Sequence, residues 1–397
     1  MVTPSLAGPD QRSPAQGIWH GRTINRQSPP CKQSETVLQR QAEPCRKLSE
    51  PTPAHAEPIL NFPLQQPGLA LAPASPQFID RYNASDQGQP GAARELADGL
   101  RATAASVSPK YFYDALGSQL FEAITHLDEY YPTRTEAGIF DAAHGHMAAA
   151  LAGAGITCPC LIDLGAGSCS KAMRLIPHLQ PRQYVPVDIS VDFLRDAAEQ
   201  VQNTFPELAI VGVGMDFSAG LLLPPQVQDH DRVFFYPGSS IGNFSPDQAL
   251  AFLQRIADPA QGAARGLLLG IDLVKDKATL EAAYDDALGV TAAFNKNLLR
   301  HVNMLLGADF DPHQWRHIAL FNEAQSRIEM HLEARCGLTV HWPEGERRFG
   351  MGERIHTESS YKYTLDSMSA LLRQAGFSQI KPWTDPKDWF AVFWASV

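Results

Sequence analysis

A short apolar run followed by a turn of small residues constrains this chain more than any other feature. Residues 160–164 read CLIDL, and the turn after them contains Gly165, Gly167 and Ser168 before a helical pattern begins at Ser170. Glycines let a backbone pass close to a ligand, and a helix N-terminus offers N–H groups to it. The order predicts a ligand-binding turn in an α/β sheet, although such turns also occur for packing reasons and in dinucleotide-binding enzymes.

Further strand-like runs recur along the chain, with helical or loop segments between them. They lie at residues 184–187, 208–212, 232–236 and 267–273, and a helix is expected over 140–151. Such alternation is typical of a parallel, doubly wound sheet.

The second half of the chain has a different character. We expect a long helix over 278–306, then antiparallel ribbon over 327–335, 338–342 and 354–363, and finally a helix over 367–375 and two strands ending at Trp394. The expected inward stripe of the long helix is Leu280, Tyr284, Leu288, Phe294 and Leu298. A parallel sheet with an antiparallel end resembles the fold of the adenosylmethionine-dependent methyltransferases.

Composition excludes several classes of protein. The net charge is 33 − 43 = −10, whereas nucleic-acid binders concentrate positive charge. No apolar run approaches the ~20 residues that span a bilayer. Six cysteines in 397 residues do not form a dense disulfide framework, so we expect a reducing, cytoplasmic location. Cys158 and Cys160 lack the spacing of common zinc sites, and we expect no metal.

The first part of the chain differs from the rest. Residues 1–90 contain 14 of the 30 prolines and no sustained apolar period. Such a composition cannot offset the entropy cost of ordering the chain. We therefore predict a disordered extension over residues 1–91, without an amphipathic targeting helix.

Polar residues follow the later strands at the edge where the cofactor turn lies. Asp188 ends the second strand, where a carboxylate can accept ribose hydroxyls, although a helix N-cap is the alternative. Asp216 and Phe217 follow the third strand and suit an adenine ring. Because neither a full Gly-x-Gly-x-x-Gly fingerprint nor a Walker-type loop occurs, the sequence favours S-adenosylmethionine over NAD.

Several collinear motifs together resemble the histidine-specific methyltransferases that open ergothioneine biosynthesis. The resemblance covers residues 100–397. Its motifs are PKYFYDALGSQLFE (109–122), EYYPTRTE (129–136), LGAGSCSK (164–171), YVPVD (184–188), GSSIGN (238–243), DLVKD (272–276), RIEM (327–330) and TESSYK (357–362).

The resemblance implies an α/β Rossmann-like methyltransferase domain, residues 136–274 and 363–397, with a smaller α+β substrate-binding lid, residues 92–135 and 275–362. The implied cofactor contacts are Gly165, Lys171, Asp188 and Asp216. Implied contacts to the amino acid's backbone groups are Tyr130, Gly238, Asn243 and Tyr284, with Tyr113 near the amine as the catalytic residue. Glu358 and Ser360 would bind the imidazole, with Met330 packed against it.

The implied activity is three methylations of the α-amine of L-histidine, giving trimethylhistidine (hercynine), by a monomer. Glu358 and Ser360 share one face of the expected ribbon, opposite Ile355 and Thr357, and could instead be solvated strand residues. Two alternatives stay open. One is a methyltransferase for another amino acid or small amine, and the other is a non-catalytic scaffold that binds an adenosyl ligand.

Overall fold

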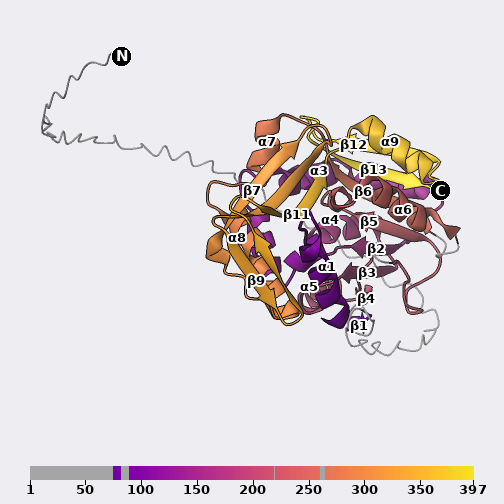
Figure 1. Ribbon diagram of the computed structural model, residues 1–397. Helices are drawn as coiled ribbons and strands as arrows, with labels where there is room; N and C mark the ends of the chain where they lie inside the picture. The colour runs from indigo at the N-terminus through magenta and orange to yellow at the C-terminus, as the bar shows by residue number, and fades with distance from the viewer. Residues whose placement is uncertain (1–74, 82–88, 219, 260–263) are drawn as a thin grey trace, which may run out of the picture. The chain divides into compact units, whose positions relative to one another are not determined.

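Eight strands form the main sheet, in the order β1-β4-β3-β2-β5-β6-β13-β12 (Figure 1). The computed structural model describes residues 75–81, 89–218, 220–259 and 264–397. The strands are β1 Gln77–Asp80, β2 Cys160–Leu164, β3 Gln183–Asp188, β4 Ala209–Gly214, β5 Arg232–Tyr236, β6 Ala264–Asp272, β12 Gln379–Thr384 and β13 Phe390–Ser396. β13 runs antiparallel to both β6 and β12, and the other pairs are parallel. The predicted doubly wound sheet with an antiparallel end is confirmed.

The sheet reverses its strand order between β2 and β5, which are hydrogen-bonded neighbours. All residues of both strands are buried, as expected for strands covered on both faces. At such a switch point, the crevice beyond the carboxyl ends of the strands is the usual ligand site of an open α/β sheet. The turn after β2 and the loop after β5 therefore meet where the sequence placed the cofactor.

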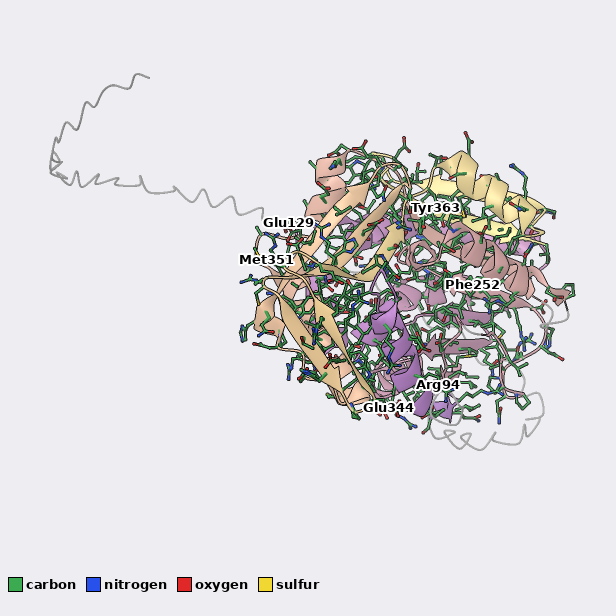
Figure 2. All side chains as sticks on the ribbon, viewed as in Figure 1. Arg94, Glu129, Phe252, Glu344, Met351 and Tyr363 are labelled. Atoms are coloured by element: carbon green, nitrogen blue, oxygen red, sulfur yellow. The ribbon has the colours of Figure 1, made fainter. Side chains whose placement is uncertain are left out.

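Helices cover both faces of this sheet. On one face lie α3 Tyr131–Gly153, α4 Ser170–Leu179 and α5 Val191–Thr204, which share a core with alternate strand residues such as Leu161 and Val233. On the other lie α6 Pro246–Ala257 and α9 Leu365–Gln374. Phe252 of α6, labelled in Figure 2, packs its ring 5.1 Å from that of Tyr236. No helix in the described ranges is long and apolar enough to cross a membrane.

A second core lies under two smaller sheets. One sheet has the order β11-β8-β7 and the other is the hairpin of β9 and β10, drawn in orange in Figure 1. The remaining elements are α1 Gln89–Arg101, η1 Pro109–Phe112, α2 Ala115–Thr125, η2 Ser240–Asn243, α7 Lys277–Ala282, α8 Val290–Leu306, η4 Pro312–Gln314, β7 Trp315–Asn322, β8 Arg327–Ala334, β9 Leu338–Trp342, β10 Gly345–Phe349 and β11 Arg354–Tyr361. This core draws residues from both 92–131 and 280–355. The boundaries 92–135 and 275–362 stay predictions.

The predicted extension over residues 1–91 is wrong for residues 77–80 and for residues 89–91, which begin α1, and most of the rest of it lies outside the described residues. Gln77–Asp80 form β1, which pairs in parallel with β4 at the edge of the main sheet. The guanidinium of Arg195 lies 4.9 Å from the ring centre of Phe78. A four-residue strand has no periodicity to detect, and it is stabilised by a sheet edge that composition cannot reveal.

The predicted long helix over 278–306 is two helices, α7 and α8. Between them, the Asp286 carboxylate accepts hydrogen bonds from the amides of Val290 and Thr291, at 2.9 and 2.7 Å, and so caps the start of α8. Leu288 lies in this break with 80% of its surface exposed, so its assignment to the inward stripe was wrong. Leu280, Tyr284, Phe294 and Leu298 are buried as predicted.

The pairing of β11 with β8 is irregular between His356 and Glu358, which leaves Thr357 as an extra residue. A bulge of this kind reverses the alternation of side chains beyond it. The expectation that Glu358 and Ser360 lie opposite Ile355 was therefore wrong, because Ile355 and Glu358 pair with Leu332 and Met330, which share one face of β8. Thr357, the extra residue, is buried as well. The bulge places Glu358 directly across the ladder from Met330.

Gly270 of β6 gives the buried Glu136 side chain its space. A Cβ at Gly270 would lie 2.0 Å from Glu136 Oε1 and 3.2 Å from the Gly238 amide nitrogen. Gly270→Ala should therefore lower the free energy of unfolding by about 1–3 kcal/mol in urea titrations. The control Gly145→Ala, in an exposed part of α3 with nothing within 4 Å, should raise it by roughly 0.5–1 kcal/mol. Equal stabilities of the two variants would contradict this packing.

Candidate active site

The turn between β2 and α4 is built by glycines in left-handed conformations. Gly165 and Gly167 have φ values of +70° and +51°. The amides of Gly165 and Ala166 both donate to the carbonyl of Val187, which fixes the turn against β3. A Cβ on Gly167 would meet no heavy atom within 4 Å, so there is open space beside the turn. This space fits a ligand that lies against the backbone.

Two predicted cofactor carboxylates follow β3 and β4. Asp188 accepts hydrogen bonds from the amides of Gly167, at 3.0 Å, and Ser190, at 2.9 Å. Burial raises the pKa of Asp188 above its ordinary value, and these amide bonds oppose the increase. Asp216 accepts from the Ser218 amide at 3.0 Å. Since a carboxylate oxygen accepts more than one hydrogen bond, Asp188 retains capacity for hydroxyl donors.

Sequence reasoning missed Lys110, which reaches Asp216 from η1. Its Nζ lies 3.2 Å from Asp216 Oδ2 and 2.8 Å from Glu95 Oε2. Burial would lower the pKa of Lys110, but these two carboxylates raise it above its ordinary value. This ion pair connects the segment before α2 with the loop after β4.

Lys171, another predicted cofactor contact, pairs with the fully buried Glu136 of α3. Their Nζ and Oε2 atoms are 2.7 Å apart. The second carboxylate oxygen of Glu136 accepts from the Gly238 amide at 2.8 Å. One carboxylate thus holds both a residue of α4 and the loop after β5. Sequence analysis included Glu136 in a motif without giving it a role.

All eight predicted substrate-side residues line one cavity. They are Tyr113, Tyr130, Gly238, Asn243, Tyr284, Met330, Glu358 and Ser360. The lining also contains residues for which the sequence predicted no contact with the substrate, namely Phe121, Ile124, Ser239, Ser240, Ala283, Thr291 and Phe294. The predicted cofactor residues Gly165, Lys171, Asp188 and Asp216 are not in this lining. Of these four, Lys171 is connected to the lining through Glu136, which also accepts from the Gly238 amide.

Three tyrosines and two phenylalanines form one wall of this cavity. The ring of Tyr113 packs edge-on to Phe121 and Phe294, and the Tyr130 ring packs edge-on to Phe121 and Tyr284. Burial raises the pKa of Tyr113 and of Tyr130 well above the ordinary value. Both hydroxyls therefore stay protonated at neutral pH and supply uncharged hydrogen-bonding groups.

Glu358 also lines this cavity, with 8% of its surface exposed. Its carboxylate has no hydrogen-bond partner among the described residues. Burial raises the pKa of Glu358 to about 7, and the charge of Lys362 partly opposes this increase. Buried polar groups in proteins are almost always hydrogen-bonded, so an unpartnered carboxylate facing a cavity marks a place where a ligand supplies the donor.

Behind Glu358 lies a buried charged network that sequence reasoning missed. Lys362 Nζ is 2.9 Å from each of Tyr284 Oη, Ser360 Oγ and Asp272 Oδ2. Lys275 Nζ lies 2.6 Å from Asp272 Oδ1. Although burial alone would raise it, the two lysines hold the pKa of Asp272 below its ordinary value. Both lysines lie within the quoted motifs, which was the available signal.

The expectation that Cys158 and Cys160 bind no metal stays a prediction. Cys158 is exposed and Cys160 is the first residue of β2, and both are free thiols. Within the described ranges, no group of three or more histidine, cysteine, aspartate or glutamate side chains is arranged to hold a metal.

Comparison with known proteins gives the family. Residues 92–397 match the model of the family described as histidine-specific methyltransferase, SAM-dependent. The histidine N-alpha-methyltransferase of Mycolicibacterium smegmatis is 40% identical over 79% of this chain and 97% of its own length, and that of Mycobacterium tuberculosis is 38% identical over 77% and 95%. A 4-dimethylallyltryptophan N-methyltransferase of Arthroderma benhamiae is 26% identical over 78% and 94%. The chain belongs to the family of histidine-specific, S-adenosylmethionine-dependent methyltransferases.

Proposed function

We propose that this protein transfers methyl groups from S-adenosylmethionine to the α-amine of L-histidine. Three transfers give trimethylhistidine, which makes the reaction the first step of ergothioneine biosynthesis. The observation that carries the proposal is the buried Glu358, which lies beside Ser360 in the cavity and has no hydrogen-bond partner in the part of the chain that the structure describes. The similarity to two proteins named histidine N-alpha-methyltransferase supports it.

Four residues around the glycine turn would hold the cofactor, which supplies an electrophilic methyl carbon on a sulfonium when it is bound. Gly165 gives the backbone close approach, and Lys171 lies at the start of α4. Asp188 would accept the ribose hydroxyls. Asp216, followed by Phe217, would accept from the adenine amino group. The open space beside Gly167 fits a ligand of this kind.

The backbone groups of the amino acid would meet uncharged partners. Tyr130 and Asn243 offer donors to its carboxylate without adding positive charge beside a sulfonium, and Tyr284 lines the same cavity with its hydroxyl donating to Ser360. Because Glu136 already occupies the amide of Gly238, the backbone group that this glycine offers to a ligand is its carbonyl. A carbonyl accepts hydrogen bonds and so suits an amine, which Tyr113 would orient from the opposite side.

The α-amine must lose a proton before it can act as a nucleophile. Its reference pKa is about 8, so deprotonation at neutral pH is only modestly uphill. The Tyr113 hydroxyl, kept neutral by burial, orients the amine. It relays the proton of the amine to water and does not act as an anionic base. The cavity walls contribute alignment and exclusion of water. The reaction ends at the third methyl group because the quaternary nitrogen has no lone pair.

A single chain supplies every residue of the proposed site, which supports a monomer as the active form. The described cysteines are free thiols, as suits a cytoplasmic enzyme. Methylation of a tryptophan-like amino acid is the second candidate function, favoured by the similarity to the Arthroderma benhamiae enzyme. Against it, an indole has an N–H donor for Glu358 but no acceptor nitrogen for Ser360.

Substrate identity can be tested by mass spectrometry. After incubation with S-adenosylmethionine and histidine, tryptophan or tyrosine in separate reactions, we expect mono-, di- and trimethylated products from histidine only. Equal turnover of tryptophan would contradict the proposal and favour the second candidate.

The two halves of the site can be separated by titration calorimetry. Glu358→Ala should weaken histidine binding by about 10-fold or more, because a buried ring N–H loses its acceptor, while S-adenosylhomocysteine binding stays close to wild type. Asp188→Ala should abolish S-adenosylhomocysteine binding. The reverse pattern would contradict both assignments.

The raised pKa of Glu358 predicts that this residue destabilises the ligand-free protein at high pH. Between its ordinary pKa of 4.5 and about 7, the folded state binds more protons at Glu358 than the unfolded state, so stability falls as pH rises through this window. Glu358→Gln lacks this loss. Its stability relative to wild type should increase by up to about 3 kcal/mol from pH 5 to pH 8 in thermal unfolding. A difference that does not change with pH would contradict the prediction.

A further inference from the structure

We infer that Lys362 is a positioning residue that fixes Ser360 as a hydrogen-bond donor toward the substrate ring, so that the site requires an acceptor nitrogen in addition to a ring N–H. The inference rests on the proposed function, because it concerns how the same cavity selects its ring. Lys362 is not in the cavity lining, and it acts through Tyr284 and Ser360.

The Lys362 ammonium has as many donors as it has acceptors around it. It is 3% exposed, and its three N–H groups match the three oxygens at 2.9 Å, from Tyr284, Ser360 and Asp272. Because an ammonium donates and never accepts, both hydroxyl oxygens must accept from it. The pairing with Asp272 offsets the cost of burying the charge.

The hydroxyl of Ser360 can then make only one further hydrogen bond, as a donor. Tyr284 Oη also donates to Ser360 Oγ, at 2.8 Å. A hydroxyl oxygen has two acceptor sites, and Lys362 and Tyr284 occupy both of them. The hydrogen of Ser360 is therefore the group it can offer to a ligand in the cavity. Ser360 donates, and ionised Glu358 beside it accepts.

This pair of opposite polarity matches a neutral imidazole, which carries one N–H donor and one acceptor nitrogen. A pyrrole ring has the N–H and would satisfy Glu358, but it would place a C–H group against the Ser360 hydrogen. A site built to hydrogen-bond a particular group rejects an analogue that lacks it, because the buried polar group is left unpaired. Without Lys362, the Ser360 hydroxyl could turn away and donate to Tyr284 instead.

The chain provides a matched control for this role. Lys275 is the second buried lysine on Asp272 and donates to Asp272 Oδ1 and Tyr131 Oη, at 2.6 and 2.7 Å. It makes no contact with Tyr284 or Ser360 among the interactions of the described residues. Lys275→Met and Lys362→Met both remove one cation from Asp272, but only the second frees the hydroxyl pair.

The experiment measures ring discrimination by titration calorimetry on the full chain with S-adenosylhomocysteine bound. The ligands are histidine and pyrrolylalanine, tested as both ring isomers. The ratio of the pyrrolylalanine Kd to the histidine Kd should fall about 10-fold or more in Lys362→Met, because pyrrolylalanine no longer leaves a fixed donor unpaired. It should stay at the wild-type value in Lys275→Met. The kcat/KM of pyrrolylalanine relative to that of histidine should rise in Lys362→Met and stay at the wild-type value in Lys275→Met.

A Lys362→Met variant that binds S-adenosylhomocysteine but keeps the wild-type ratio overturns the inference. If that variant does not fold, Ser360→Ala decides, because it removes the donor that Lys362 is inferred to fix and leaves the Lys362–Asp272 pair intact. A lowered ratio in Ser360→Ala supports the inference, and an unchanged ratio overturns it. Wild-type protein that does not bind histidine would overturn the proposed function itself, which is a distinguishable result.

Discussion

The buried contact between Lys362 and Asp272 connects the two parts of this protein. Asp272 ends β6 of the main sheet, and Lys362 directly follows β11 of the smaller sheet. The backbone joins at the same point, because the Tyr363 amide donates to the Asp272 carbonyl at 3.2 Å. A buried charge is tolerated only when it is paired and hydrogen-bonded. The ion pair therefore fixes how β11, and with it Glu358 and Ser360, meets the carboxyl edge of the main sheet.

Three fully or almost fully buried carboxylates at this edge differ in what they contact. Glu136 holds Lys171 and the Gly238 amide, and Asp272 holds two lysines and the Tyr131 hydroxyl. The third, Glu358, has no hydrogen-bond partner within the described residues. The first two stabilise the arrangement of strands and loops around the cavity. The third costs stability in the ligand-free protein, and this cost is the physical sign of a binding group.

Much of the main sheet could be predicted from the sequence, because its strands are short apolar runs separated by helical segments. The limits of β5, residues 232–236, were predicted to the residue. Strand β7 received no prediction, and the break before α8 was missed, since it depends on Asp286 capping amides four and five residues later. The bulge at Thr357 depends on pairing with β8, which no local pattern reveals.

The candidate site was predictable for a different reason. Composition and periodicity identified the glycine turn, Asp188 and Asp216, whereas the substrate-side residues came from the resemblance of collinear motifs. The structure brings these substrate-side residues into one cavity. The roles of Lys110, Glu136 and Lys362 could not be predicted, because each depends on a partner more than 20 residues away in the chain, at distances that only the fold sets.

The most direct test of the role of Glu358 is a crystal structure of the protein with histidine and S-adenosylhomocysteine bound. We expect a Glu358 carboxylate oxygen at roughly 2.7–3.2 Å from one ring nitrogen of histidine and the Ser360 hydroxyl at a similar distance from the other. A histidine ring turned away from Glu358, with the carboxylate contacting only water or protein, would contradict the assignment of this cavity to imidazole recognition.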